Sequence, residues 1–371
     1  MNVLIQLSHP AHFHLFKNVA KNMIEDGNKV LFVIKSKDIL EQLLVDAGLP
    51  YVNINQHTHR GSKFGILWDM LVREFRIVRL CRKHKIDLLT GSTPDIAHAG
   101  WWLRKWRVNV AEDDLAVVPI FDIIASRFVQ CLVIPDPCNL GHIENKGAHY
   151  PGYHELAYLH PNHFTADASV VKGYGIDTDK PYFLIRFAQL NAHHDDGIKG
   201  INAVIAQRLV DILKPHGRIY ITSERPLEPQ FEEYRIKINP LDMHHVMAFA
   251  SLYIGDSQTM AAEAGVLGVP FVRFNDFVGR IGYLNELEND YELGYGIKAS
   301  TEGSVERLCE RVEALVDMKF EERRSVFQAR RKKMLLEKID CAKFLTYFIE
   351  QYPASAEITR KADAEFWQQF K

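Results

Sequence analysis

The chain has 371 residues, of which 47% are hydrophobic and 25% charged, and its formal net charge at pH 7 is −2. That length and composition suit a globular protein of two domains, and the near balance of charge argues against a dedicated nucleic-acid binder. The five cysteines show no C-x-x-C spacing, which favours reduced thiols over a disulfide framework or a zinc site.

The start of the sequence does not have the pattern of a targeting segment. Its first apolar run, Val3–Leu7, is short and follows no basic residues, so we expect no signal peptide. A run of about 20 apolar residues, the length that spans a bilayer, is also missing. We therefore expect a cytoplasmic protein. Trp and basic residues cluster in 101–107, which keeps peripheral contact with the inner face of a membrane open as an alternative.

The first elements follow a βαβ pattern. Val3–Leu7 is expected as a buried strand, Ser8–His14 as the turn into a helix that ends near residue 26, and Lys29–Lys35 as the second strand. The turn has no G-x-G-x-x-G sequence, so a dinucleotide site is not expected there. Ligands of parallel sheets bind beyond the carboxyl ends of strands, where His9 and His12 fall. These two histidines are candidates for proton transfer, although one of them could simply cap the helix.

Strands and helices continue to alternate through the rest of the first half of the sequence. Three acids, Glu112-Asp113-Asp114, stand at the end of an expected strand, where they would meet the same edge of the sheet. Residues 135–152 are rich in Pro, Gly, Asn and His and are expected as a long functional loop. Polar residues 56–63 are expected as another loop. Further helices are expected at 37–47 and 66–84, and strands at 51–54, 87–89, 108–111 and 128–134.

A second βαβ series follows a linker expected at 162–180. Its first strand, 182–185, ends at Arg186, and the next loop contains His193-His194-Asp195-Asp196. Adjacent loop residues rarely all face one ion, so we expect no metal site there. Strands are also expected at 218–222 and 234–238, and helices at 201–213, from 239 onward, and at 302–317, 320–337, 342–352 and 364–370.

The stretch 252–274 is the most informative part of the sequence. A short apolar strand passes through Gly255-Asp256-Ser257-Gln258-Thr259 into a helix, and Gly268 and Pro270 end that helix before another strand. In one interpretation this is an ordinary βαβ unit in which Ser257 caps the helix. In the other, the helix N-terminus binds phosphate, and Glu263, about one turn further on, accepts hydrogen bonds from a ribose diol.

The string GDSQTMAAEAGVLGVP resembles the nucleotide-sugar signature of GT-B proteins, such as the N-acetylglucosaminyltransferase of peptidoglycan synthesis and the non-hydrolysing UDP-N-acetylglucosamine 2-epimerases. The resemblance implies that Ser257, Gln258 and Thr259 contact the diphosphate and that Glu263 contacts the ribose. It also implies a basic residue near the diphosphate, for which Arg186 is the candidate.

Further stretches resemble a GT-B-like family of unknown function from polysaccharide and lipid-sugar gene neighbourhoods. They include His9-Pro10-Ala11-His12, Glu112-Asp113-Asp114, residues 150–159 and Leu184-Ile185-Arg186-Phe187. His154 stands where that family's pattern has Lys, which weakens the expectation of a charge role for this side chain.

We therefore predict an α/β, GT-B-like fold of two doubly wound Rossmann-like domains facing across a cleft. Residues 1–170 would form the N-terminal domain for the acceptor or sugar, and residues 171–345 the nucleotide-sugar domain. Residues 346–371 would form a helix that crosses back to the first domain.

The function predicted from the resemblance is glycosyl transfer from a UDP-sugar to a saccharide or lipid-linked acceptor in surface polysaccharide or glycolipid synthesis. The UDP-sugar would be a substrate, and neither a metal nor a cofactor is expected. His12 and Glu112 are the candidate bases, with His9 beside them. One alternative is a sugar 2-epimerase, although Ser92 or Thr93 stands where its pattern has an acid. Another is a non-catalytic nucleotide-sugar-binding protein.

Overall fold

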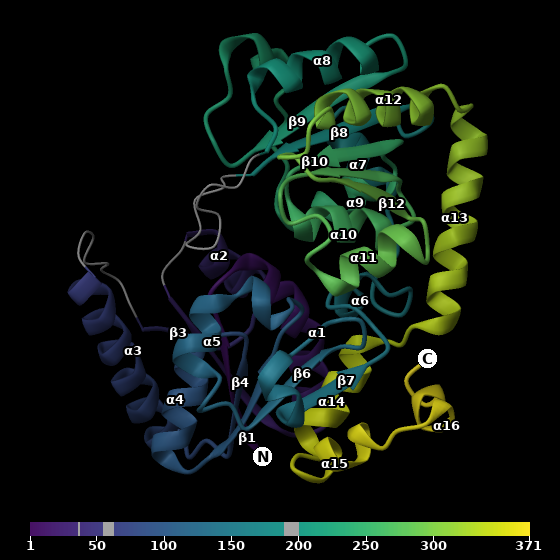
Figure 1. Ribbon diagram of the computed structural model, residues 1–371. Coiled ribbons are helices and arrows are strands. Elements are labelled where there is room, and N and C mark those ends of the chain that lie inside the picture. The colour runs from purple at the N-terminus through teal and green to yellow at the C-terminus, as the bar shows by residue number, and fades with distance from the viewer. Residues whose placement is uncertain (36–37, 55–62, 189–199) are drawn as a thin grey trace. The chain divides into compact units, whose positions relative to one another are not determined.

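The computed structural model describes residues 1–35, 38–54, 63–188 and 200–371. Contacts divide the chain into two compact units (Figure 1). Unit 1 comprises Met1–His163 and Lys338–Lys371, and unit 2 comprises Phe164–Glu337. Each unit is described by itself below.

Both boundaries lie seven or eight residues before the predicted ones, which were 170/171 and 345/346. The second shift has a clear local cause at Asp340. Its side chain caps the last long helix and accepts hydrogen bonds from Asn162 at 3.0 Å and His163 at 2.8 Å. The chain from residue 338 onward is thereby attached to the end of the first stretch of unit 1.

Unit 1 contains a seven-stranded parallel sheet in the order β3-β2-β1-β4-β5-β6-β7. Helix α14 packs on α1, and Asn28, between α1 and β2, donates to Glu350 at the end of α14 at 2.6 Å. The elements of unit 1 are β1 (Asn2–Leu7), α1 (Pro10–Glu25), β2 (Lys29–Ile34), α2 (Asp38–Asp46), β3 (Tyr51–Asn53), α3 (Lys63–Lys83), β4 (Leu88–Gly91), α4 (Pro94–Leu103), β5 (Trp106–Val110), the 3₁₀ turn Leu115–Val117, α5 (Pro119–Ala125), β6 (Cys131–Pro135), the 3₁₀ turn Gly141–Lys146, β7 (Gly147–Tyr150), α6 (Leu156–Leu159), α14 (Cys341–Glu350), α15 (Ala354–Arg360) and α16 (Ala364–Gln368).

Unit 2 contains a five-stranded parallel sheet in the order β12-β11-β10-β8-β9. Its elements are α7 (Ala168–Gly173), β8 (Tyr182–Phe187), α8 (Ala203–Leu213), β9 (Arg218–Ser223), the 3₁₀ turn Pro229–Tyr234, α9 (Met243–Ala248), β10 (Leu252–Gly255), α10 (Gln258–Val266), β11 (Phe271–Phe274), α11 (Gly282–Asn289), β12 (Gly294–Ile297), α12 (Ser304–Val316) and α13 (Phe320–Glu337).

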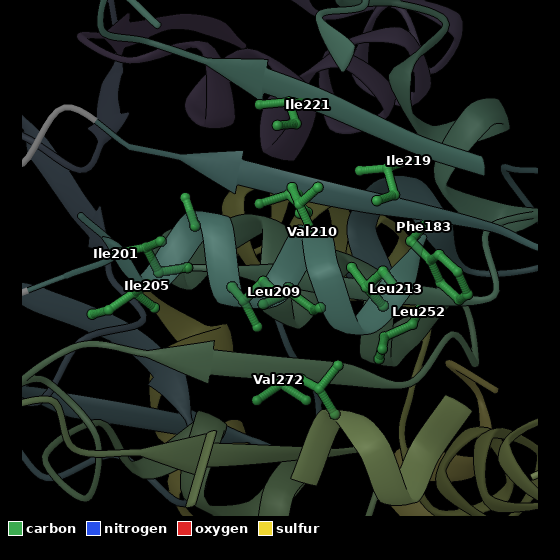
Figure 2. Packing of buried hydrophobic residues seen from close by; sticks show 14 of the residues in the cluster. Phe183, Ile201, Ile205, Leu209, Val210, Leu213, Ile219, Ile221, Leu252 and Val272 are labelled. Carbon is green, nitrogen blue, oxygen red and sulfur yellow. The ribbon is translucent and has the colours of Figure 1, made fainter. Parts of the chain in front are cut away.

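Side chains along each strand of unit 2 point alternately to the two faces of its sheet. Phe183 and Ile185 of β8 share one buried cluster with residues of α8 and α12. Figure 2 shows Leu209 and Leu213 of α8 beside Phe183 and Leu252. Each fully buried side chain of this size contributes about 1.5–3 kcal/mol to folding. Since successive side chains point to opposite faces, Arg186 of β8 points to the other face, which α9 and α10 cover.

The predicted α/β class with two parallel sheets is confirmed, but two local predictions were wrong. Residues 135–152 contain β7, a short edge strand whose four residues carry too weak a periodicity to be read from sequence. Residues 234–238 make only one bridge, between Arg235 and Ile221, before the chain reaches Pro240, which has no amide to donate. The expected linker 162–180 contains the boundary between the two units, at 163/164, and also the short helix α7.

Candidate functional site

In unit 1, the strand order reverses between β1 and β4. β2 and β3 lie beyond β1, and β5 to β7 lie beyond β4. Ligands of parallel sheets bind beyond the carboxyl ends of strands at such a reversal. Gly91 ends β4 with φ +143°, and a Cβ built there would lie 2.5 Å from the backbone oxygen of Gln6 on β1. The close approach of the two strand ends therefore requires glycine at this position.

His9 and His12 follow β1 at this edge. His9 is the N-cap of α1, and its Nδ1 accepts a hydrogen bond from the amide of Ala11 at 3.2 Å. The Nδ1 of His12 accepts from the amide of Ser8 at 3.3 Å, and the two ring centroids are 6.2 Å apart. Because each Nδ1 accepts from a backbone amide, the neutral form of each ring carries its proton on Nε2. Both rings are thus set up as hydrogen-bond donors through Nε2.

Glu112 follows β5 and pairs with His154, which the sequence had not led us to expect. Its Oε2 lies 3.0 Å from the Nδ1 of His154, a residue that is 7% exposed. Burial by itself would raise the pKa of Glu112. His154 lowers that pKa through its charge and hydrogen bond, His12 and His9 add to the effect, and the net shift is downward. Glu112 is therefore ionised at neutral pH, within electrostatic reach of the two histidines after β1.

Asp113, the next residue, titrates differently. Burial raises its pKa to about 7, and the adjacent charge of Glu112 contributes in the same direction. Two neighbouring carboxyl groups whose environments shift their pKa values in opposite directions can take different roles in proton transfer. Asp113 is the one whose pKa is matched to exchanging a proton near neutral pH.

The position where the epimerase pattern has an acid lies at the start of α4. Thr93 donates its hydroxyl to Oε1 of Gln6 at 2.6 Å. Asp95, two residues further on, is 5% exposed and is held by Arg73 at 3.2 Å and by Gln6 at 2.8 Å. This acid therefore connects β1, α3 and α4, and its carboxylate is already engaged in structural contacts.

In unit 2, the strand order reverses between β8 and β10, and Asp256 connects their ends. Its Oδ1 accepts from the amide of Ala188 at 2.7 Å, and its Oδ2 accepts from the amide of Ile201 at 3.3 Å. The residue is 2% exposed, and burial raises its pKa to about 6 despite these hydrogen bonds. Asp256 thus fastens the chain on both sides of residues 189–199 to the end of β10.

The N-terminus of α10 lies at the same reversal. Ser257 caps the helix, because its Oγ accepts from the amide of Met260 at 3.4 Å. The side-chain oxygen of Gln258 accepts from Asn275 at 2.6 Å. Within the described parts of the chain, no group accepts from the backbone amides of Gln258 and Thr259. An anion at this helix end would meet two amides and the positive end of the helix dipole.

Glu263, the predicted ribose ligand, is buried with a histidine partner. It is 5% exposed, and its Oε1 lies 2.9 Å from the Nε2 of His244 on α9, which is also 5% exposed. The pair joins α9 to α10 within unit 2. The predicted contact with a ribose stays a prediction, and His244 is the residue that would orient the carboxylate for it.

Arg186, the predicted diphosphate ligand, lies on the same face of the sheet as α10. It is paired in register with Gly255, and a Cβ built on that glycine would lie 3.1 Å from the Cβ of Arg186. Its guanidinium forms an ion pair with Glu224, which follows β9. Arg186 is therefore placed beside the start of the α10 turn, but its charge is already shared with a half-exposed carboxylate.

The described residues offer neither a metal cluster nor a membrane-spanning helix. No group of three or more His, Cys, Asp or Glu in those ranges is arranged to hold a metal ion. Across the same ranges, no helix combines the length and the hydropathy that crossing a bilayer requires. The sequence His193-His194-Asp195-Asp196 and most of the polar loop 56–63 lie outside the described residues.

Three residues for which the sequence predicted no role take part in these sites: His154, His244 and Asp256. His154 falls in a stretch that resembles the GT-B-like family, and this was the only signal for it. His244 and Asp256 carry no signal of their own, since their partners lie 19 to 68 residues away in the chain.

No protein-family model matches the sequence, and no curated protein matches it. Solved structures do match. The UDP-GlcNAc 2-epimerase from Neisseria meningitidis, bound to UDP-GlcNAc, is 14% identical with a TM-score of 0.57 over 91% of this chain and 100% of that one. MnaA of S. aureus, in a structure with UDP, is 9% identical with a TM-score of 0.66 over 95% and 97% of the two chains.

A glycosyltransferase structure matches as well. The spinosyn rhamnosyltransferase SpnG, complexed with thymidine diphosphate, is 14% identical with a TM-score of 0.58 over 97% of this chain and 99% of that one. Similarity at these identities is evidence of fold alone. The chain has the fold of these proteins, the GT-B-like fold of two parallel α/β units that its sequence motifs predicted.

Proposed function

We propose that this chain is a glycosyltransferase that uses a nucleotide-diphosphate sugar, with UDP as the nucleotide, in the synthesis of a surface polysaccharide or glycolipid. The observation that carries the proposal is the N-terminus of α10, at the strand reversal of unit 2, where two backbone amides donate to no described residue. Proteins of the same fold are described as bound to UDP-GlcNAc, UDP and thymidine diphosphate, which supports this assignment.

Departure of the diphosphate requires stabilisation of its negative charge. The amides of Gln258 and Thr259 and the positive helix end would supply part of it. Arg186 would supply a cationic partner by exchanging Glu224 for a phosphate oxygen. Glu263, oriented by His244, would accept hydrogen bonds from the ribose hydroxyls.

The acceptor hydroxyl would lose its proton in unit 1. Glu112 is ionised at neutral pH, so it can accept a proton, and His154 holds one of its oxygens in place. His12 and His9 would then act as donors through Nε2, which suits them to orient the acceptor or the sugar. This arrangement favours Glu112 over His12 as the base among the two predicted candidates.

Two measurements test the donor site. Calorimetry with UDP in EDTA should give saturable binding, since amides and an arginine need no divalent ion to hold a diphosphate. Binding that appears only with Mg²⁺ or Mn²⁺ would contradict this site. A thermal-shift screen of nucleotide sugars should then identify the donor, because a ligand of the native state raises the melting temperature.

A second candidate is a sugar 2-epimerase, favoured by the pKa of about 7 at Asp113 beside the ionised Glu112. Epimerisation removes a proton from carbon and returns one from solvent, whereas glycosyl transfer leaves every ring C–H bond intact. With the transferase, UDP-GlcNAc kept in deuterated water with the protein takes up no deuterium. One deuterium per sugar with a changed configuration at carbon two would replace the transferase proposal by the epimerase.

A further inference from the structure

Three helices of unit 1, α3, α4 and α5, are neighbours in the fold (Figure 1). Each of them carries large apolar side chains that are exposed. The helices are joined through His98 of α4. Its Nδ1 lies 2.5 Å from a carboxylate oxygen of Glu74 on α3, and its Nε2 lies 2.7 Å from the backbone oxygen of Ile124 on α5. The outer surface of these helices and of the turn into β5 is called the α3–α5 face below.

The apolar side chains of this face are unusually exposed for their size. Trp68 and Phe75 on α3 are 63% and 64% exposed, and Ile123 on α5 is 83% exposed. Leu71 and Ile120 are 40% and 47% exposed. Scattered single exposures are normal in globular proteins, but five on neighbouring helices form a patch that needs a partner.

Helix α3 presents one outer stripe that changes character along its length. Trp68, Leu71, Phe75, Arg79 and Arg82 are separated by three or four residues, so they share one side of the helix. Both arginines are exposed. The stripe is therefore apolar in its first half and basic in its second.

The end of α4 and the start of β5 add a second mixed patch. Trp101, Trp102 and Trp106 are 52%, 49% and 42% exposed, and with Arg104 and Lys105 they line an open hollow of about 670 Å³. Tryptophan beside arginine and lysine is the composition that concentrates at the boundary between lipid headgroups and acyl chains.

We propose that the α3–α5 face docks on the surface of an anionic phospholipid bilayer. The apolar side chains of α3 and α5 enter the headgroup region, and the arginines and the lysine of the face meet the negative phosphates. The charge of the face favours an anionic bilayer over a second copy of this chain as its partner. The exposed cations Arg79, Arg82 and Arg104 complement an anionic surface. A second copy of this chain would bring the same cations against one another. The inference does not depend on the reaction proposed above.

The test uses the full chain and phospholipid vesicles. Co-sedimentation should show binding to phosphatidylcholine vesicles containing phosphatidylglycerol, much weaker binding to phosphatidylcholine alone, and loss of binding as salt is raised. The double variants Phe75→Ser/Ile123→Ser and Arg79→Glu/Arg82→Glu should each bind at least about tenfold more weakly. Unchanged binding of either variant would overturn the proposal.

Matched control variants lie on unit 2. Leu336→Ser removes an apolar side chain that is 65% exposed, and Arg324→Glu/Lys332→Glu reverses two exposed cations on the same helix, α13. Both should bind vesicles like the wild type. If these controls lose as much binding as the α3–α5 variants, vesicle binding depends on net charge or general hydrophobicity and not on this face. That result would overturn the proposal.

A measurement on the unaltered protein covers the case in which a variant fails to fold. Four of the five tryptophans lie on the α3–α5 face. Anionic vesicles made with brominated acyl chains should quench the tryptophan fluorescence, because bromine quenches only rings that reach the bilayer. Absence of quenching would contradict the proposal. So would light scattering that shows a dimer which the Phe75→Ser/Ile123→Ser variant abolishes, since the face would then bind a second copy.

Discussion

Glu263, buried against His244, can contribute to nucleotide binding, to stability or to both. Two substitutions at this position distinguish these contributions. Glu263→Gln keeps the size of the side chain and an oxygen that can accept the hydrogen bond now made at 2.9 Å to His244. We therefore expect it to lower the free energy of unfolding by no more than about 1 kcal/mol. It removes the charge that would strengthen hydrogen bonds from a ribose, so UDP affinity should fall by about 1–3 kcal/mol, which is roughly 5- to 150-fold.

Glu263→Ala gives the structural contrast. It removes the carboxylate partner of His244, which is 5% exposed, and the loss of this buried hydrogen bond costs about 1–3 kcal/mol before any loss of packing is added. Urea unfolding should therefore show a large loss for Glu263→Ala and a small one for Glu263→Gln. Glu306→Gln, an exposed carboxylate elsewhere in unit 2, serves as the control for charge removal.

Calorimetry with UDP decides the role of the carboxylate. If Glu263→Gln unfolds normally and binds UDP with wild-type affinity, the ribose assignment is wrong and the pair is purely structural. If Glu263→Gln destabilises the protein as strongly as Glu263→Ala, the reasoning about the retained hydrogen bond to His244 is wrong instead.

Three further perturbations test other parts of the two sites. Asp256 has a pKa of about 6 in the folded protein, against an ordinary value of 3.8. Its ionisation therefore opposes folding, and the free energy of unfolding should fall by about 3 kcal/mol as the pH rises from about 4 to 6. Urea unfolding of Asp256→Asn should lack that component of the pH dependence, and an identical pH profile would refute the shift. Glu224→Gln should free Arg186 and tighten UDP binding a few-fold by calorimetry, whereas weaker binding would place Glu224 itself on the ligand. His12→Ala and Glu112→Ala should lower acceptor-dependent UDP release far more than UDP affinity, and equal losses in both would assign them to ground-state binding.

Local pattern was sufficient for most of the fold. Mostly apolar runs such as Val3–Leu7, interrupted only by Gln6, indicated strands buried on both faces. Helix limits followed from caps and breakers near them in sequence, as at Ser257 and Gly268. The edge strand β7 was missed because four residues, Gly147–Tyr150, carry almost no periodicity. Its place is decided by pairing with β6 rather than by its own composition.

The candidate sites were likewise predictable from sequence only in part. Sequence pattern was enough to propose Glu112, Glu263 and the turn before α10, because residue type and spacing within one strand–turn–helix unit are local properties. It could not reveal that His154 would contact Glu112 across 42 residues, or that Arg186 would be shared with Glu224. Such partners depend on which strand ends become neighbours, and that is set by the strand order of each sheet. The protonation behaviour of Glu112 and Asp113 follows from those partners and from burial, which only the tertiary structure determines.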